Sequence, residues 1–189
     1  GMTLAEVAAE RETSAADTAI DLVIEDGSRV QVVYFLMSEE NVARGIGLPW
    51  VSFASDARSM TTAGSFIEQS THPRAYGNFA RVLGKYVREE QIISLPEAIR
   101  KLSKLPASNL KIRDRGELRE SYFADIVIFD PADIQDHATF DDPHQYATGM
   151  AYVLVNGGIV ISEGEHTGAL PGQVGRGPGW RGWKDSDTD

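Results

Sequence analysis

A short apolar stretch that ends on an acidic residue, and a polar cluster further along, carry residue types found in active sites. Asp56 follows the apolar residues 50–54, and His72, Arg74 and Tyr76 lie together before a helical pattern. A carboxylate at the end of a buried strand can ligate a divalent metal and act as general base on metal-bound water. An arginine at a helix start suits bidentate capture of a carboxylate, which the helix dipole also favours.

Each of these residues also has a structural interpretation. Asp56 could be a helix N-cap or a loop aspartate paired with an arginine. Arg74 could form a surface ion pair, which from spacing alone is its more common role. His72 precedes Pro73 and is therefore held extended, either as a substrate contact or as a loop-packing histidine. The residue types leave these alternatives open.

No self-contained metal site or nucleophilic triad is evident. The histidines lie in loop-like sequence without His-x-His or His-x-x-x-His spacing: His72, His137, His144 and His166. The stretch around His144 has a metal-like composition, but a structural loop is the preferred interpretation. Ser38 and Ser55 have no histidine nearby, and no phosphate-binding glycine motif is present.

Composition narrows the class of protein. The chain has 189 residues, 42% of them hydrophobic, which is enough for a real core. Its net charge of −10 argues against nucleic acid or an anionic membrane as partner. It has no cysteine, which excludes disulfides and thiolate metal sites. It shows no apolar run long enough to span a membrane and no signal-peptide pattern. We therefore expect a cytoplasmic protein.

Helical and strand-like patterns alternate in the first part of the chain, after a capping box at Thr3 that predicts a first helix. The expected order is helix, strand, helix, strand: residues 14–26, 30–36, 38–44 and 50–54. This order with short connections is typical of a parallel α/β unit. Two buried parallel strands cannot form a sheet with both faces covered, so the pattern predicts further structure beside them.

The rest of the chain changes from helical to strand patterns. A long polar loop over 57–71 precedes predicted helices at 75–90, from Ser94 to about Leu105, and just beyond. A strand at 124–129, a loop over 132–149 and a hairpin around Asn156-Gly157 follow. The predicted organisation is therefore three parts: residues 1–112, residues 113–179 and a disordered tail over 180–189.

Six segments resemble N-acyl-D-amino-acid deacylases (D-aminoacylases) of the amidohydrolase superfamily: residues 33–41, 53–57, 71–84, 124–131, 155–157 and 164–172. The resemblance extends from about residue 3 to 179. The ADIVIFDP and VNG elements recur across amidohydrolases, whereas the Ser-Asp pair followed by HPRAYG, and EHTGALPG, are far more specific to the deacylase branch.

The resemblance implies an α/β plus β fold. Family members combine a metal-bearing (β/α)8 barrel with a small β domain. The chain resembles only the C-terminal portion: a partial barrel with the last two strands, 30–36 and 50–54, and their helices, then the C-terminal part of a small β-sandwich domain. The first part would cover residues 1–112 and the second residues 113–179.

The resemblance also implies site roles. Asp56 would be the general base and a metal contact, Arg74 would hold the substrate carboxylate, and His72 and Tyr76 would bind substrate beside it. The His-x-His of the first barrel strand, the bridging ligand and the later histidines have no counterpart here. We therefore expect zinc in a complete enzyme but none bound tightly by this chain. The loop over 57–71 is longer than in typical deacylases, which leaves the substrate range open.

Two functions follow from these observations. In the first, the chain is part of a zinc-dependent hydrolase of small N-acyl-D-amino acids and is inactive without a complementing N-terminal half. In the second, it is a non-catalytic module that self-associates as a homodimer through an open barrel edge.

Overall fold

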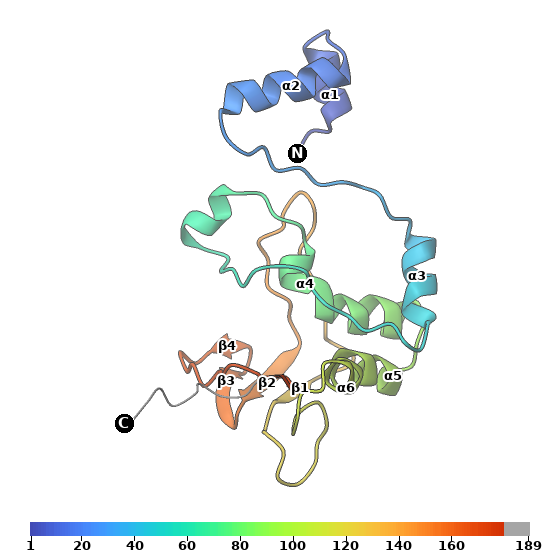
Figure 1. The fold of residues 1–189 in the computed structure, drawn as a ribbon, viewed down its shortest axis with the longest axis vertical. Helices are drawn as coiled ribbons and strands as arrows, with labels where there is room; N and C mark the ends of the chain where they lie inside the picture. Colours follow the sequence, from blue (N-terminus) through green and yellow to red (C-terminus); the bar gives the residue numbers. More distant parts are fainter. Residues whose placement is uncertain (180–189) are drawn as a thin grey trace. The chain divides into compact units, whose positions relative to one another are not determined.

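The computed structural model describes residues 1–179, and the chain divides into two compact units, Gly1–Met37 and Ser38 onward (Figure 1). The tail predicted over 180–189 lies outside the described residues. The first unit contains α1 (Leu4–Glu10) and α2 (Ala15–Asp26). Both helices begin as predicted, because Thr3 forms a complete capping box and the Ser14 side chain accepts the N–H of Asp17. Gly27 ends α2 with a φ of 63°.

The strand predicted over residues 30–36 is not formed. The segment after α2 has no regular structure and exposes most of its apolar side chains, with Tyr34 at 75%, Leu36 at 83% and Met37 at 77% exposure. A strand exists only through hydrogen bonds to a neighbour, and the described residues provide no ladder for this segment. The predicted strand is therefore absent from the described residues, although the apolar pattern behind the prediction is present.

The second unit begins with α3 (Glu39–Gly47), which runs past its predicted end at Arg44. The strand predicted over residues 50–54 is also not formed, for the same lack of a ladder. This segment is nevertheless anchored, because Phe53 packs against the hydrophobic core. The core therefore fixes the chain three residues before Asp56.

The predicted helices over 75–90 and after Ser94 are confirmed as two continuous helical runs. One consists of α4 (Arg74–Arg81) and η2 (Val82–Glu89), and the other of α5 (Leu95–Ile99), η3 (Arg100–Lys104) and α6 (Leu105–Asn109). The 57–71 loop contains a short 3-10 helix, η1 (Gly64–Glu68). No helix in the described part of the chain is long and apolar enough to cross a membrane.

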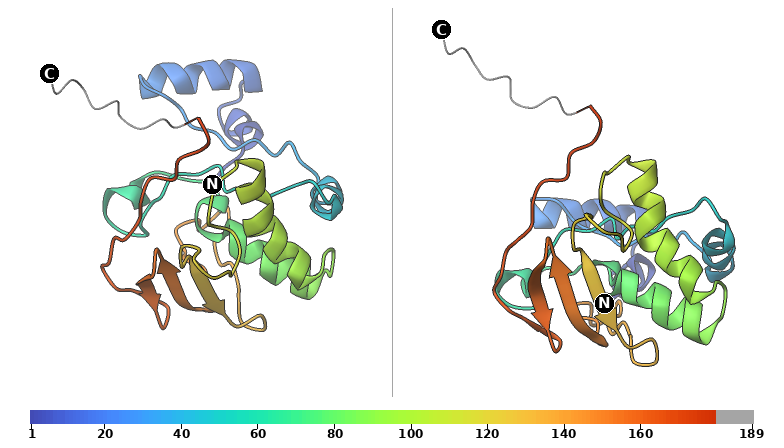
Figure 2. Two further views of the ribbon diagram at one scale, coloured as in Figure 1. Left: turned by 60° about the horizontal axis from the view of Figure 1, so that its bottom comes forward. Right: turned by 90° about the horizontal axis from the view of Figure 1, so that it is seen from below.

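The strands form one antiparallel sheet in the order β1-β2-β3-β4, side by side in Figure 2. Its strands are β1 (Ile126–Phe129), β2 (Met150–Val155), β3 (Gly158–Ser162) and β4 (Glu165–His166). The predicted strand and hairpin are confirmed, with Asn156 and Gly157 at φ values of 48° and 81° in the turn. The short β4 was not predicted. Residues 1–179 contain no second sheet to complete a sandwich.

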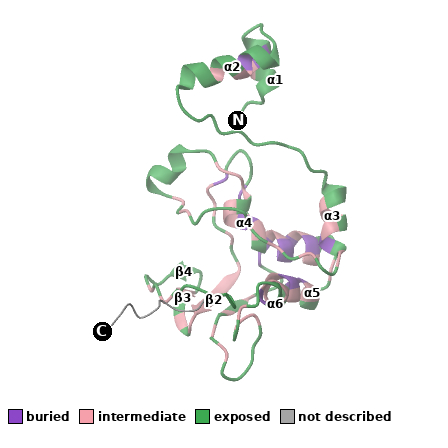
Figure 3. Ribbon diagram, viewed as in Figure 1, coloured by how far each residue is buried: buried purple, intermediate pink, exposed green. Residues whose placement is uncertain are grey.

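The hydrophobic core of the second unit joins the two helical runs to the loop before β2. Its buried members are Ala80, Val82, Leu83, Ala98 and Ile134. Figure 3 shows buried stretches in purple along the helical runs. Phe129 and Met150 of the sheet pack against this cluster. The core therefore holds α4, which carries Arg74 and Tyr76, in a fixed position.

Gly77 lies where α4 approaches another segment closely, and this predicts a measurable cost for any side chain. A Cβ at Gly77 would come within 2.7 Å of Asp136 Cβ, and the Asp136 side chain is only 7% exposed. We expect Gly77→Ala to lower the free energy of unfolding by about 1–3 kcal/mol in urea denaturation. The matched control is Gly45→Ala in α3, where a Cβ meets nothing within 4 Å. That substitution should instead stabilise by about 0.5–1 kcal/mol, and equal effects would contradict the close approach.

Candidate active site

Arg74 and Asp56 meet at the start of α4. Arg74 Nη2 lies 2.8 Å from Asp56 Oδ2 and also donates to the Asp56 carbonyl at 3.2 Å. Asp56 has a φ of 47°, a left-handed conformation that is uncommon outside glycine. The structure thus places the candidate base against the candidate carboxylate clamp, which is also the arginine pairing expected of a loop aspartate.

This ion pair is easily opened. The Asp56 side chain is 87% exposed and that of Arg74 is 42% exposed. Pairs in such settings contribute at most about 1 kcal/mol, because water and salt screen them. A carboxylate on a bound molecule could therefore replace Asp56 on the guanidinium at little cost.

His72 is fixed by the backbone of the motif that it opens. Its Nδ1 accepts the N–H of Arg74 at 3.0 Å, and its ring meets Phe140 edge-on at 5.0 Å between centroids. Burial, and next the positive charge of Arg74, lower the pKa of His72 from its usual 6.5. An imidazole that accepts at Nδ1 carries its proton on Nε2, so His72 is a neutral donor at pH 7.

The lowered pKa of His72 predicts a pH dependence of folding. As the pH is lowered below about 6.5, the unfolded chain takes up this proton before the folded chain does. The free energy of unfolding therefore decreases as the pH is lowered, until the pH is below the folded-state pKa. We expect His72→Asn, which can keep the bond to the Arg74 N–H, to reduce this slope in unfolding measured from pH 7.5 to 5. The control is His166→Asn, since the exposed His166 makes the same bond to Gly168 N–H. Equal changes in both variants would contradict the role of burial.

Tyr76 points to the loop after Asp56. Its hydroxyl donates to the Thr61 carbonyl at 2.8 Å, and its ring contacts His144 and Tyr146 edge-on, each at 5.8 Å. Burial raises the pKa of the Tyr76 hydroxyl, so it stays protonated at neutral pH. The hydroxyl of Tyr76, a residue predicted to bind substrate, is thus engaged within the chain.

Two further residues hold the segment before Asp56. Asn78 donates from Nδ2 to the Ala54 carbonyl at 3.2 Å. Lys101 is fully buried and donates from Nζ to the carbonyls of Leu48, at 2.7 Å, and Ile46. Asn78 lies one helical turn after Arg74, and this spacing could have identified it as a residue on the same face of the helix. Nothing in the sequence marks Lys101 as a residue that holds this segment.

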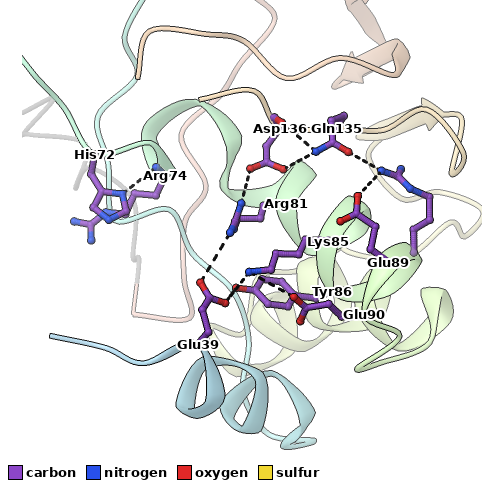
Figure 4. A network of polar contacts seen from close by, with 11 residues as sticks. Glu39, His72, Arg74, Arg81, Lys85, Tyr86, Glu89, Glu90, Gln135 and Asp136 are labelled. Carbon is purple, nitrogen blue, oxygen red and sulfur yellow. Dashed lines mark hydrogen bonds and ion pairs between the residues drawn. The ribbon is translucent and has the colours of Figure 1, made fainter. Parts of the chain in front are cut away.

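A separate polar network ties α3 and the 134–137 loop to the α4–η2 helix (Figure 4). Glu39 Oε2 accepts from Lys85 Nζ at 2.8 Å and from the Tyr86 hydroxyl at 3.1 Å. Arg81 pairs with Asp136 at 3.0 Å. The hydrogen bond from Lys85 lowers the pKa of Glu39. These groups satisfy one another, so we assign the network to positioning α4.

The described residues do not by themselves fit a zinc ion. No three or more His, Asp or Glu side chains of residues 1–179 gather in a group that could hold a metal. Asp56 offers one carboxylate, whereas zinc sites use three or four protein ligands. His144 packs on Tyr76, and its buried Nε2 has no hydrogen-bond partner. Its surroundings are those of a packed loop, the interpretation preferred from sequence.

Comparison with known proteins relates the chain to amidohydrolases. A model described as amidohydrolase family matches residues 51–161. The chain is 37% identical to the D-aminoacylase of Alcaligenes xylosoxydans xylosoxydans, over 92% of this chain and 34% of that protein. It is 42% identical to the N-acyl-D-aspartate deacylase of the same organism, over 75% of this chain and 27% of that protein.

Solved structures give the same result. A crystal structure of D-aminoacylase matches with a TM-score of 0.79 and 35% identity, over 93% of this chain and 34% of that one. The N-acyl-D-glutamate deacylase of Bordetella bronchiseptica, in complex with zinc and a phosphonate inhibitor, matches with a TM-score of 0.73 and 34% identity, over 88% and 33%. The chain thus spans about a third of the length of the relatives that it matches.

Proposed function

Because this chain belongs to the amidohydrolase family, we propose that it supplies the proton-accepting and carboxylate-binding part of a metal-dependent hydrolase of N-acyl-D-amino acids. The observation that carries the proposal is the contact between Asp56 and Arg74 at the start of α4. Its relatives are named for deacylation of N-acyl-D-aspartate and N-acyl-D-glutamate, or as D-aminoacylases, which supports this substrate class.

Arg74 would bind the substrate carboxylate and thereby free Asp56. A guanidinium holds a carboxylate through parallel N–H donors, so a bound N-acyl amino acid would replace Asp56 on Arg74. The released Asp56 carboxylate would then accept the proton of the attacking water and pass it to the leaving amine. Substrate binding and base release would thus be coupled through one arginine. His72, neutral and donating from Nε2, would lie beside the bound carboxylate.

The metal would be held by ligands outside this chain, with Asp56 as its one contact here. We propose that segments 30–36 and 50–54 are the last two strands of a (β/α)8 barrel over residues 1–112, and that residues 113–179 belong to a small β domain. The exposed apolar side chains of Tyr34, Leu36 and Met37 support this, because a barrel would bury such a segment between neighbouring strands. The remaining strands and metal ligands would then be required for activity.

A chimera tests the proposed function. Residues 3–179 would replace the matching third of the Alcaligenes D-aminoacylase, and hydrolysis of N-acetyl-D-amino acids with added zinc would be measured. We expect turnover by the chimera, little on the L-enantiomers, and none by the isolated chain. Clear turnover by the isolated chain would refute the need for a partner. A folded, metal-loaded chimera without turnover would refute the deacylase assignment.

The second candidate is a non-catalytic module that self-associates through its apolar segment. The exposed apolar residues of 30–37 favour it, since exposed edges and patches of this kind promote pairing between chains. Light scattering would show a dimer that Leu36→Lys converts to monomer. A monomer at all concentrations would exclude this candidate.

A further inference from the structure

Two tyrosine hydroxyls form hydrogen bonds to the segment that follows Asp56. Tyr76 donates to the Thr61 carbonyl at 2.8 Å. Tyr146 donates to Thr61 Oγ1 at 3.4 Å and accepts the N–H of Thr62 at 3.3 Å. We call Tyr76 and Tyr146 the tyrosine clamp. The backbone and side chain of Thr61 and the backbone of Thr62 are thus held from two directions.

The clamp joins elements that are far apart in sequence. Tyr76 lies on α4, whereas Tyr146 lies on the loop between Gln135 and Thr148, 84 residues after Thr62. That loop is itself fixed, because Gln135 pairs with Thr148 in a β-bridge and Ala147 packs against the core. Its rings pack on the start of α4 through the Phe140 to His72 and His144 to Tyr76 contacts. The tyrosine clamp therefore connects the loop after Asp56 to segments that pack against the core.

The other end of the segment is fixed independently. Phe53 packs against the core, and the Ala54 carbonyl accepts from Asn78. Asp56 lies between these anchors and the tyrosine clamp with its φ at 47°. A non-glycine residue persists in this region of φ when its surroundings determine it. Both anchors together thus determine where the Asp56 carboxylate lies.

We propose that Tyr76 and Tyr146 are positioning residues that hold Asp56 in place for proton transfer, so that the loop over 139–148 contributes to the rate of the reaction. The catalytic part of this inference rests on the proposed function. Arg74 is held separately, by α4 and by the bond from its N–H to His72. Loss of the clamp should therefore displace the base more than the carboxylate-binding group.

The mechanical part is tested on the isolated chain by NMR. Tyr146→Phe keeps the ring on Tyr76 and removes the hydroxyl. We expect the Thr62 amide to exchange about 10-fold faster, and the backbone order parameters of residues 56–62 to fall from near 0.85 toward 0.6. Tyr122→Phe is the control, because the Tyr122 hydroxyl makes no hydrogen bond within the described part of the chain. If Tyr146→Phe changed neither the Thr62 amide exchange rate nor the order parameters of residues 56–62, the inference that the tyrosine clamp holds this segment would be overturned.

The catalytic part is tested in the chimera. We expect Tyr146→Phe, and likewise Tyr76→Phe, to lower kcat about 10-fold with little change in KM, because the base moves while Arg74 stays. An active chimera whose kcat is insensitive to both substitutions, or in which only KM rises, would overturn the positioning role. Inactivity of the unsubstituted chimera would instead contradict the proposed function. The NMR result would still show whether the tyrosine clamp holds residues 56–62.

Discussion

Replacing Asp56 with asparagine is expected to lower kcat of the chimeric deacylase by about 10²–10⁴-fold. The amide has the size of the carboxylate but cannot accept the proton of the attacking water, and general-base catalysis contributes rate factors of this order. KM should change little, because Arg74 remains available for the substrate carboxylate. Steady-state kinetics on N-acetyl-D-amino acids measures both constants.

The control for Asp56→Asn separates chemistry from folding. The pair with Arg74 is highly exposed, so the isolated chain should lose at most about 1 kcal/mol of unfolding free energy. Asp133→Asn alters an exposed aspartate whose side chain makes no hydrogen bond or ion pair among residues 1–179, and it should leave kcat unchanged. A similar loss of kcat in both variants, or retained activity in Asp56→Asn, would remove Asp56 from the role of base.

Arg74→Lys is expected to lower kcat/KM about 10–100-fold, mainly through KM, on substrates with a free carboxylate. Lysine keeps the charge but loses the forked donors that bind a carboxylate at two oxygens, and hydrogen bonds to charged groups contribute about 1.5–3 kcal/mol. The loss should follow the substrate carboxylate, so the measurement compares each N-acetyl-D-amino acid with its carboxylate-free amide.

The amide comparison decides the role of Arg74. If the amide loses as much kcat/KM as the acid, Arg74 supports the structure around Asp56 and does not bind substrate. Arg58→Lys is the matched control, because Arg58 lies in the same loop and makes no hydrogen bond or ion pair with other described residues. Its kcat/KM should stay within about twofold of the unsubstituted chimera, since nothing places its guanidinium on the substrate.

Helices and the hairpin could be predicted because their signals are local. Ser14 caps α2 and Gly27 ends it within one segment, and Asn156-Gly157 forms its turn through its own backbone preferences. At Ser94, where a helix was predicted to begin, the side chain accepts the N–H of Glu97, but the Glu97 side chain pairs with Arg100 and does not reach back. The strands predicted at 30–36 and 50–54 did not form, for a different reason. Their apolar pattern is local, but a strand needs a hydrogen-bonded neighbour, and residues 1–179 provide none.

The sequence alone identified Asp56 and Arg74 as a possible base and carboxylate clamp, because side-chain chemistry and the order along the chain are properties of the sequence. It could not show that the two carry an ion pair with each other, or that Tyr76 grips Thr61. Tyr146 and Lys101 were missed entirely, because their partners lie tens of residues away and meet them only when the core forms. Contacts between distant segments depend on how the helices and loops pack, and only the tertiary structure decides this.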